Sequence, residues 1–145
     1  MVTDMSEMSN SEEEPLGSLL HRMVAMLRPE VSAELRPLGL SLPEFVCLRM
    51  LSLQPKRSSA DLARDSHVTA QAMNQLLHKL QQLGVVTRPA SAAAGRTLPA
   101  ELTPEGYALL ERAERAVHIA DRRAIGRLTP PEQRQLRMLL RKATS

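Results

Sequence analysis

Apolar residues recur at helical spacing along most of the chain, and prolines or glycines separate the runs. The first run covers residues 16–27 and predicts a helix. Pro29 follows, so we expect a kink or break near Arg28, because an internal proline removes a backbone donor and clashes with the preceding turn. A second run predicts a helix that opens at Leu42 and ends near Pro55.

Two closely spaced helices follow. Ser58 and Asp61 fit a capping box that starts a short helix, since each side chain can bond a free backbone donor of the first turn. After a tight turn, Thr69 is the expected N-cap of a longer helix, and Gly84 is placed to end it. The apolar face of this longer helix comprises Met73, Leu76, Leu77, Leu80 and Leu83.

The next segment reads as extended chain. Residues 85–88 predict a strand, residues 91–95 form a turn of small residues, and residues 97–102 predict a returning strand that Pro99 interrupts. Together they predict a β-hairpin directly after the longer helix.

The C-terminal third is helical again. Thr103 opens a long helix with a narrow, alanine-rich apolar face. A capping box of Thr129 with Glu132 opens the last helix, and Leu136, Leu139 and Leu140 form its apolar side. The order of elements predicts a mainly α fold with a small β-hairpin.

Composition narrows the class of protein. A chain of 145 residues suits one domain, or a small domain with dimerisation helices, and 1% aromatic residues leave Leu, Ala, Met and Val to build the core. The net charge is +3, but residues 1–15 hold five acids and no base. The other 130 residues therefore carry 19 bases against 11 acids (16 less 5), a balance of +8 that suits an anionic partner.

The short helix from Ser58 and the longer one from Thr69 have the spacing of a helix-turn-helix, whose second helix enters the DNA major groove. We expect Arg96, on the hairpin, to reach the minor groove. A solvated helix face is the alternative for the polar residues; the hairpin favours DNA. The predicted base-reading residues are Gln71, Asn74, Gln75 and His78, with Thr69 and Lys79 on the DNA backbone.

Several segments, taken in order, resemble the MarR family of dimeric winged helix-turn-helix repressors from about Leu16 to Ala143. Residues 58–63 (SSADLA) resemble the family's helix before the turn, and residues 76–86 (LLHKLQQLGVV) its recognition helix running into the wing. Residues 95–106 (GRTLPAELTPEG) are similar to the wing arginine and the Leu-Thr-x-x-Gly start of the long helix. The last helix is also similar to that of the family.

Four positions depart from the family pattern. Ala94 stands where the family commonly has Asp, and His67 stands in a turn where Gly is frequent, so a left-handed backbone there is strained. Pro29 in the first helix and Pro99 in the wing are also unusual. These departures concern wing shape and dimer geometry more than the fold.

The resemblance implies four regions: a disordered acidic tail (1–14), an N-terminal dimerisation helix (15–40), a winged helix-turn-helix (41–103) and C-terminal dimerisation helices (104–145). It also implies a homodimer that binds a pseudo-palindromic double-stranded DNA operator, and a small aromatic or phenolic acid as effector. The apolar stripes of the first and long helices agree with a dimer. They can also pack on each other within a monomer.

The sequence gives little support for redox sensing, metal binding, catalysis or membrane association. Cys47 lies in an apolar helix, where a buried inert thiol is commoner than a redox sensor. The four histidines lack metal-ligand spacing, and no catalytic motif is present, so we expect no metal, no cofactor and no enzyme. Since neither a signal segment nor a membrane span is evident, we expect a cytoplasmic protein without a membrane partner.

The sequence therefore predicts a homodimeric transcriptional repressor, released from DNA by a small ligand. A dimeric ligand-sensing or protein-interaction module that has kept the fold but no longer binds DNA specifically is the alternative, because Ala94 and Pro99 depart from the usual wing.

Overall fold

A computed structural model describes residues 13–55, 57–88 and 99–145. Its elements are α2 (Leu16–Leu35), the 3₁₀ helix η1 (Arg36–Leu38), α3 (Leu42–Leu53), α4 (Ser59–Ser66), α5 (Ala70–Gln82), β1 (Val86–Thr87), β2 (Glu101–Leu102), α6 (Pro104–Ala124) and α7 (Pro130–Thr144). The predicted mainly α fold with a small antiparallel hairpin is confirmed.

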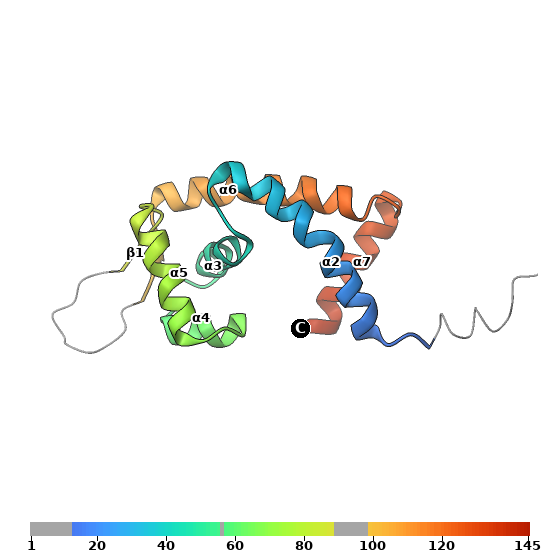
Figure 1. Ribbon diagram of the computed structural model, residues 1–145, viewed down its shortest axis with the longest axis horizontal. Coiled ribbons are helices and arrows are strands. Elements are labelled where there is room, and N and C mark those ends of the chain that lie inside the picture. Colours follow the sequence, from blue (N-terminus) through green and yellow to red (C-terminus); the bar gives the residue numbers. More distant parts are fainter. Residues whose placement is uncertain (1–12, 56, 89–98) are drawn as a thin grey trace, which may run out of the picture.

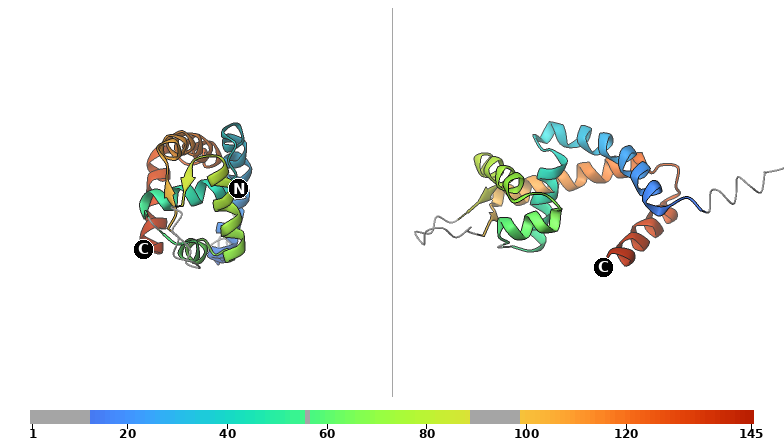
Figure 2. Two further views of the ribbon diagram at one scale, coloured as in Figure 1. Left: turned by 90° about the vertical axis from the view of Figure 1, so that its left-hand side faces the viewer. Right: turned by 60° about the horizontal axis from the view of Figure 1, so that its bottom comes forward.

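The molecule is an arch with α6 along its top (Figure 1). At one end of α6 lies the winged lobe, which we define as α3, α4, α5, β1 and β2. At the other end lies the arm, which we define as the N-terminal half of α2 (residues 16–27) together with α7. The right-hand view of Figure 2 again shows the winged lobe and α7 at opposite ends of α6, so the arch joins two spatially separate regions.

Local capping explains where most helices begin. The side chains of Ser58 and Thr129 accept from the third residue of their helices, and Asp61 and Glu132 complete the predicted capping boxes. Thr103 similarly caps α6 through the backbone N–H of Gly106. These starts are confirmed because a cap depends on neighbouring residues and little on the rest of the fold.

We expected a kink or break near Arg28, and the break is not found. The helix α2 continues through Pro29 to Leu35, although proline cannot donate the backbone hydrogen bond at its position. Packing after the proline offsets the missing bond: Val31 and Leu35 are buried, and α2 lies chiefly along α6. Tertiary contacts therefore outweigh the local signal that predicted a break.

Over the described residues, which omit 89–98, the paired strands are shorter than predicted. Val86 pairs with Leu102 and Thr87 with Glu101, and an isolated bridge joins Arg57 to Ala100 beside them. The predicted turn at residues 91–95 lies outside the described residues.

Close packing fixes the junction of the wing with α6. The backbone N–H of Thr103 donates to the carbonyl of Val85, and its hydroxyl donates to the carbonyl of Gly84. A Cβ on Gly106 would lie 2.1 Å from the oxygen of Val85. Only glycine fits there, which accounts for the glycine in the Leu-Thr-x-x-Gly motif.

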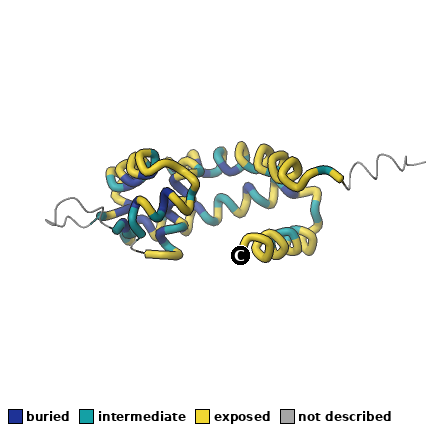
Figure 3. Tube along the Cα trace, turned by 90° about the horizontal axis from the view of Figure 1, so that it is seen from below, coloured by how far each residue is buried: buried dark blue, intermediate teal, exposed yellow. Residues whose placement is uncertain are grey.

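A single hydrophobic core occupies the winged lobe and its contact with α2 and α6. Leu35, Leu48, Leu62, Leu77 and Leu80 are completely shielded from solvent. The arm is different: every residue of α7 is described, and none is buried. The tube coloured by burial shows this contrast (Figure 3). On the expected apolar side of the last helix, Leu136 is half-buried, whereas Leu139 and Leu140 are exposed in the single chain.

Candidate nucleic-acid interface

The helices α4 and α5 form the predicted helix-turn-helix. The short helix α4 ends at His67, whose backbone is left-handed (φ 56°, ψ 39°), and Thr69 caps α5 by accepting from the N–H of Ala72 at 3.1 Å. A non-glycine residue in this conformation is strained. The strain anticipated from the departure at His67 is thus present.

The helix α5 has the two faces that the sequence predicts. Met73, Leu77 and Leu80 are buried against the lobe. The prediction was wrong for Leu83, which is 51% exposed because α5 ends just before it. The opposite face carries Gln71, Asn74, Gln75 and His78, all exposed.

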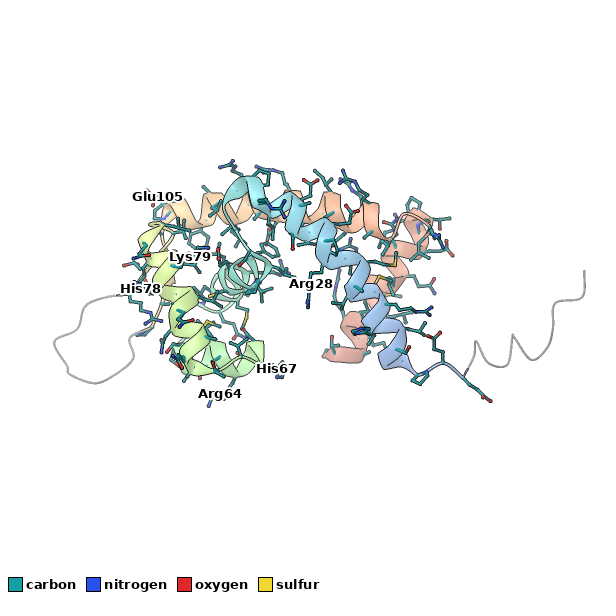
Figure 4. The ribbon with its side chains drawn as sticks, viewed as in Figure 1. Arg28, Arg64, His67, His78, Lys79 and Glu105 are labelled. Carbon is teal, nitrogen blue, oxygen red and sulfur yellow. The ribbon has the colours of Figure 1, made fainter. Side chains whose placement is uncertain are left out.

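The predicted DNA-contacting side chains are spread along the length of α5. Thr69 stands at its N-terminus, next to His67 and the exposed Arg64 of α4. The stick view shows Arg64 and His67 together at this open end of the lobe, with His78 farther along α5 (Figure 4). Sequence reasoning missed Arg64, which follows a buried alanine in a helix too short for its outer face to be recognised.

Lys79 is engaged with another helix. Its ammonium donates to the Glu44 carboxylate of α3 at 2.6 Å, and Glu44 is 3% exposed. A contact of Lys79 with the DNA backbone stays a prediction; its pairing with Glu44 is a structural fact. Glu44 was not singled out, because an acid in the first turn of a helix is usually solvated.

Arg88 directly follows β1 and was also missed as a site residue. Its guanidinium donates to the side-chain oxygen of Asn74 at 3.4 Å, while its Nε is buried and has no partner among the described residues. Desolvation lowers the pKa of Arg88. This hydrogen bond helps to orient the side chain of Asn74, one of the predicted base-reading residues.

The wing arginine cannot be placed in this way. Arg96 and Ala94 lie outside the described residues. Pro99, which is described, is half-buried and precedes the bridge from Ala100 to Arg57. The minor-groove role of Arg96 stays a prediction.

Cys47 is 1% exposed and lies 3.9 Å from the sulfur of Met73. Burial raises the pKa of its thiol to about 11, and the charge of Arg88 offsets only part of that effect. Because the thiolate is the reactive form, this environment favours the inert interpretation over redox sensing.

Metal and membrane chemistry find no support in the described ranges. Within residues 13–55, 57–88 and 99–145, no three His, Cys, Asp or Glu side chains are grouped so as to hold a metal ion. No helix in the same ranges is long and apolar enough to cross a membrane.

Known proteins share this architecture. A MarR family model matches residues 38–97. The HTH-type transcriptional repressor Rv2887 of Mycobacterium tuberculosis (strain ATCC 25618 / H37Rv) is 57% identical over 138 residues, which cover 95% of this chain and 99% of that protein.

Solved structures agree with the sequence comparison. Rv2887 in complex with DNA is similar with a TM-score of 0.81 and 56% identity, covering 92% of this chain and 100% of that one. Rv2887 in complex with p-aminosalicylic acid is similar with a TM-score of 0.79 and 59% identity, covering 90% and 99%. Wild-type MarR from E. coli, 24% identical with a TM-score of 0.78 over 90% and 98%, shares the fold.

Proposed function

Since the chain belongs to the MarR family, we propose that it is a transcriptional repressor that binds a pseudo-palindromic operator as a homodimer. One observation carries the proposal: α4 and α5 form a helix-turn-helix, and the polar face of α5 is exposed to solvent. A relative of the same architecture and more than half-identical sequence is known in complex with DNA. Its place of action is the cytoplasm.

Recognition divides between side chains and backbone. Gln71, Asn74, Gln75 and His78 read base edges in the major groove, since all four are exposed and their amide and imidazole groups donate and accept hydrogen bonds. The N-terminus of α5 at Thr69 meets a phosphate with its unpaired backbone donors. The sequence also predicts a DNA-backbone contact for Lys79, which pairs with Glu44 in the structure, and Arg96 enters the minor groove from the wing.

Dimerisation supplies the second recognition helix. Large apolar side chains of the arm are exposed in the single chain: Leu16, Leu19, Leu20, Val24, Met26, Met138, Leu139 and Leu140. A second copy that covers them by two-fold symmetry places two α5 helices on one face of the duplex. The dimerisation regions 15–40 and 104–145 and the DNA-binding region 41–103 follow from this arrangement.

The effector is a small aromatic acid, the class found with the relative Rv2887. A cavity of about 630 Å³ lies between α2 and the winged lobe, and the charged residues that line it, Arg28, Arg36 and Lys79, are all cationic. A second cavity of about 390 Å³ between α3, α6 and α7 is lined by Glu114 and Asp121 besides its arginines. The first is better matched to a carboxylate.

Fluorescence anisotropy tests the proposal. Labelled DNA from upstream of the protein's own gene is titrated at near-physiological salt in the presence of unrelated competitor DNA. We expect binding that the competitor does not erase, because base contacts add to the phosphate attraction that all DNA shares. Equal displacement by any competitor contradicts the proposal and favours a sensor or interaction module.

Replacing Arg96 with Ala tests the wing. Removal of a minor-groove arginine is expected to weaken operator binding about tenfold at matched salt, while the dimer mass stays unchanged. Light scattering measures the mass, and anisotropy measures the affinity. Lys142→Gln, on the far end of α7, is the control for removal of one positive charge; unchanged affinity of R96A contradicts the wing assignment.

A further inference from the structure

The ion pair between Glu44 and Lys79 joins the first turn of α3 to the last turn of α5. Glu44 is the third residue of α3; its Oε2 accepts from the backbone N–H of Ser41 at 3.3 Å, and its Oε1 accepts from Lys79 at 2.6 Å. A buried carboxylate is stable only when it is paired and hydrogen-bonded. The pair therefore adds a polar contact between α3 and α5 beside the buried side chains that pack α5 against the lobe.

Lys79 also faces the larger cavity. Its side chain is 54% exposed, whereas that of Glu44 is 4% exposed, so the ammonium stands at the boundary between the protein interior and the cavity. Arg28 of α2 and Arg36 of η1 line the same cavity. The stick view shows Arg28 and Lys79 on different sides of α3, on elements far apart in the sequence (Figure 4).

The ammonium has three donors but one positive charge. An anion held by Arg28 and Arg36 lies on the cavity side of the Lys79 ammonium, and Glu44 lies on its interior side. The two anionic groups therefore compete for the same positive charge. Glu44 keeps part of its stabilisation without Lys79, because the N–H of Ser41 and the N-terminus of α3 still face its carboxylate. Transfer of the ammonium therefore leaves Glu44 hydrogen-bonded but without its ion pair, and the ligand must offset the lost attraction.

We propose that Lys79 switches between Glu44 and a carboxylate bound in the Arg28–Arg36 cavity, and that this exchange couples the ligand to the orientation of α5. The inference rests on the proposed repressor function. With Lys79 on Glu44, α5 is tethered to α3 and competent for DNA. With Lys79 on the ligand, the tether is broken and DNA affinity falls, because the two ligands prefer different states.

This role differs from a DNA-backbone contact in what it predicts. If Lys79 only bound a phosphate, Lys79→Gln would lower DNA affinity and reduce the salt slope by about one, but the response to ligand would stay intact. If Lys79 is the switch, the same substitution removes the response to ligand itself.

The test measures operator affinity with and without salicylate for the wild type and for K79Q, with K142Q as a charge-matched control outside the cavity. The wild type and K142Q are expected to lose about tenfold in DNA affinity with saturating salicylate. K79Q is expected to change less than about twofold. A K79Q response as large as that of the wild type overturns the proposal, and so does a wild type that binds the operator but ignores salicylate.

Calorimetry of salicylate binding in the absence of DNA tests the exchange of Lys79 by itself, because the result does not depend on whether the protein is a repressor. E44Q keeps an acceptor for Ser41 and is expected to bind salicylate several-fold more tightly, because the competitor for Lys79 is gone. The gain is expected to vanish in E44Q/K79Q, which leaves no unpaired buried charge. A gain that survives in the double variant is a through-space charge effect and overturns the exchange, whatever the outcome with DNA.

Discussion

The winged lobe and the arm bury their apolar side chains differently. In the lobe, Leu48 and Leu77 have no exposed surface, and polar contacts such as that of Glu44 with Lys79 join the helices. In the arm, Leu16 is 70% exposed and Met138 is 59% exposed. The lobe thus completes its core within one chain, whereas the arm has apolar side chains that only another surface can cover.

The two regions have different tasks: the lobe recognises DNA bases, and the arm sets the distance between the two recognition helices of a dimer. The lobe positions the base-reading side chains of α5 through contacts inside one chain. The arm, through a second copy, sets the distance between two such helices. A repressor of this design can stop binding DNA either because α5 changes orientation or because the dimer dissociates, and substitutions distinguish the two.

The largest effect is expected from Leu139→Glu in α7. Leu139 and Leu83 are both 51% exposed, so Leu83→Glu, at the end of α5, is a matched control in the lobe. Burying a leucine contributes about 1.5–3 kcal/mol, and a two-fold interface contains the residue twice, so L139E should weaken dimerisation by at least about a hundredfold. Light scattering should then give the 16.1 kDa mass of one chain.

The control should keep twice that mass. A dimer that survives L139E, or one that L83E disrupts equally, contradicts the assignment of the arm as the dimer surface.

The next effect is expected from Leu48→Ala in the core of the lobe. Leu48 is completely buried, so the change should lower the free energy of unfolding by about 2–5 kcal/mol. Urea denaturation of L48A in the L139E background should give the same decrease relative to L139E alone, because the core closes within one chain. An L139E chain that is already unfolded contradicts the independence of the lobe.

The smallest effect is expected from His67→Gly in the turn between α4 and α5. Glycine relieves the left-handed strain at φ 56°, so the free energy of unfolding should rise by up to about 1 kcal/mol. His67→Ala keeps the strain and removes the imidazole, and it should differ little from the wild type. If thermal denaturation shows H67G to be less stable, the imidazole contributes more than the strain costs.

The features predicted correctly from the sequence depend on near neighbours. Ser58, Thr69 and Thr129 each cap a helix through the residue three positions later, and Gly84 follows the end of α5 with φ 75°. The unbroken passage of α2 through Pro29 could not be predicted, because contacts with α6 stabilise it. Arg123 of α6, for example, pairs with Glu30 and Glu34, which lie 93 and 89 positions earlier.

The candidate site was predictable on its outer face only. Gln71, Asn74, Gln75 and His78 follow from helical periodicity, and the structure exposes all four. The contacts behind that face, from Glu44 to Lys79 and from Arg88 to Asn74, join residues 35 and 14 positions apart. The sequence alone does not indicate which distant residue a charged side chain will contact in the folded protein.

Hydroxyl-radical footprinting of the operator with the wild-type protein tests the central claim most directly. A two-fold dimer with one α5 helix per half-site predicts two protected segments related by symmetry, with centres about one helical turn, or 10–10.5 base pairs, apart. A single protected segment, or protection spread evenly along the DNA, contradicts the account.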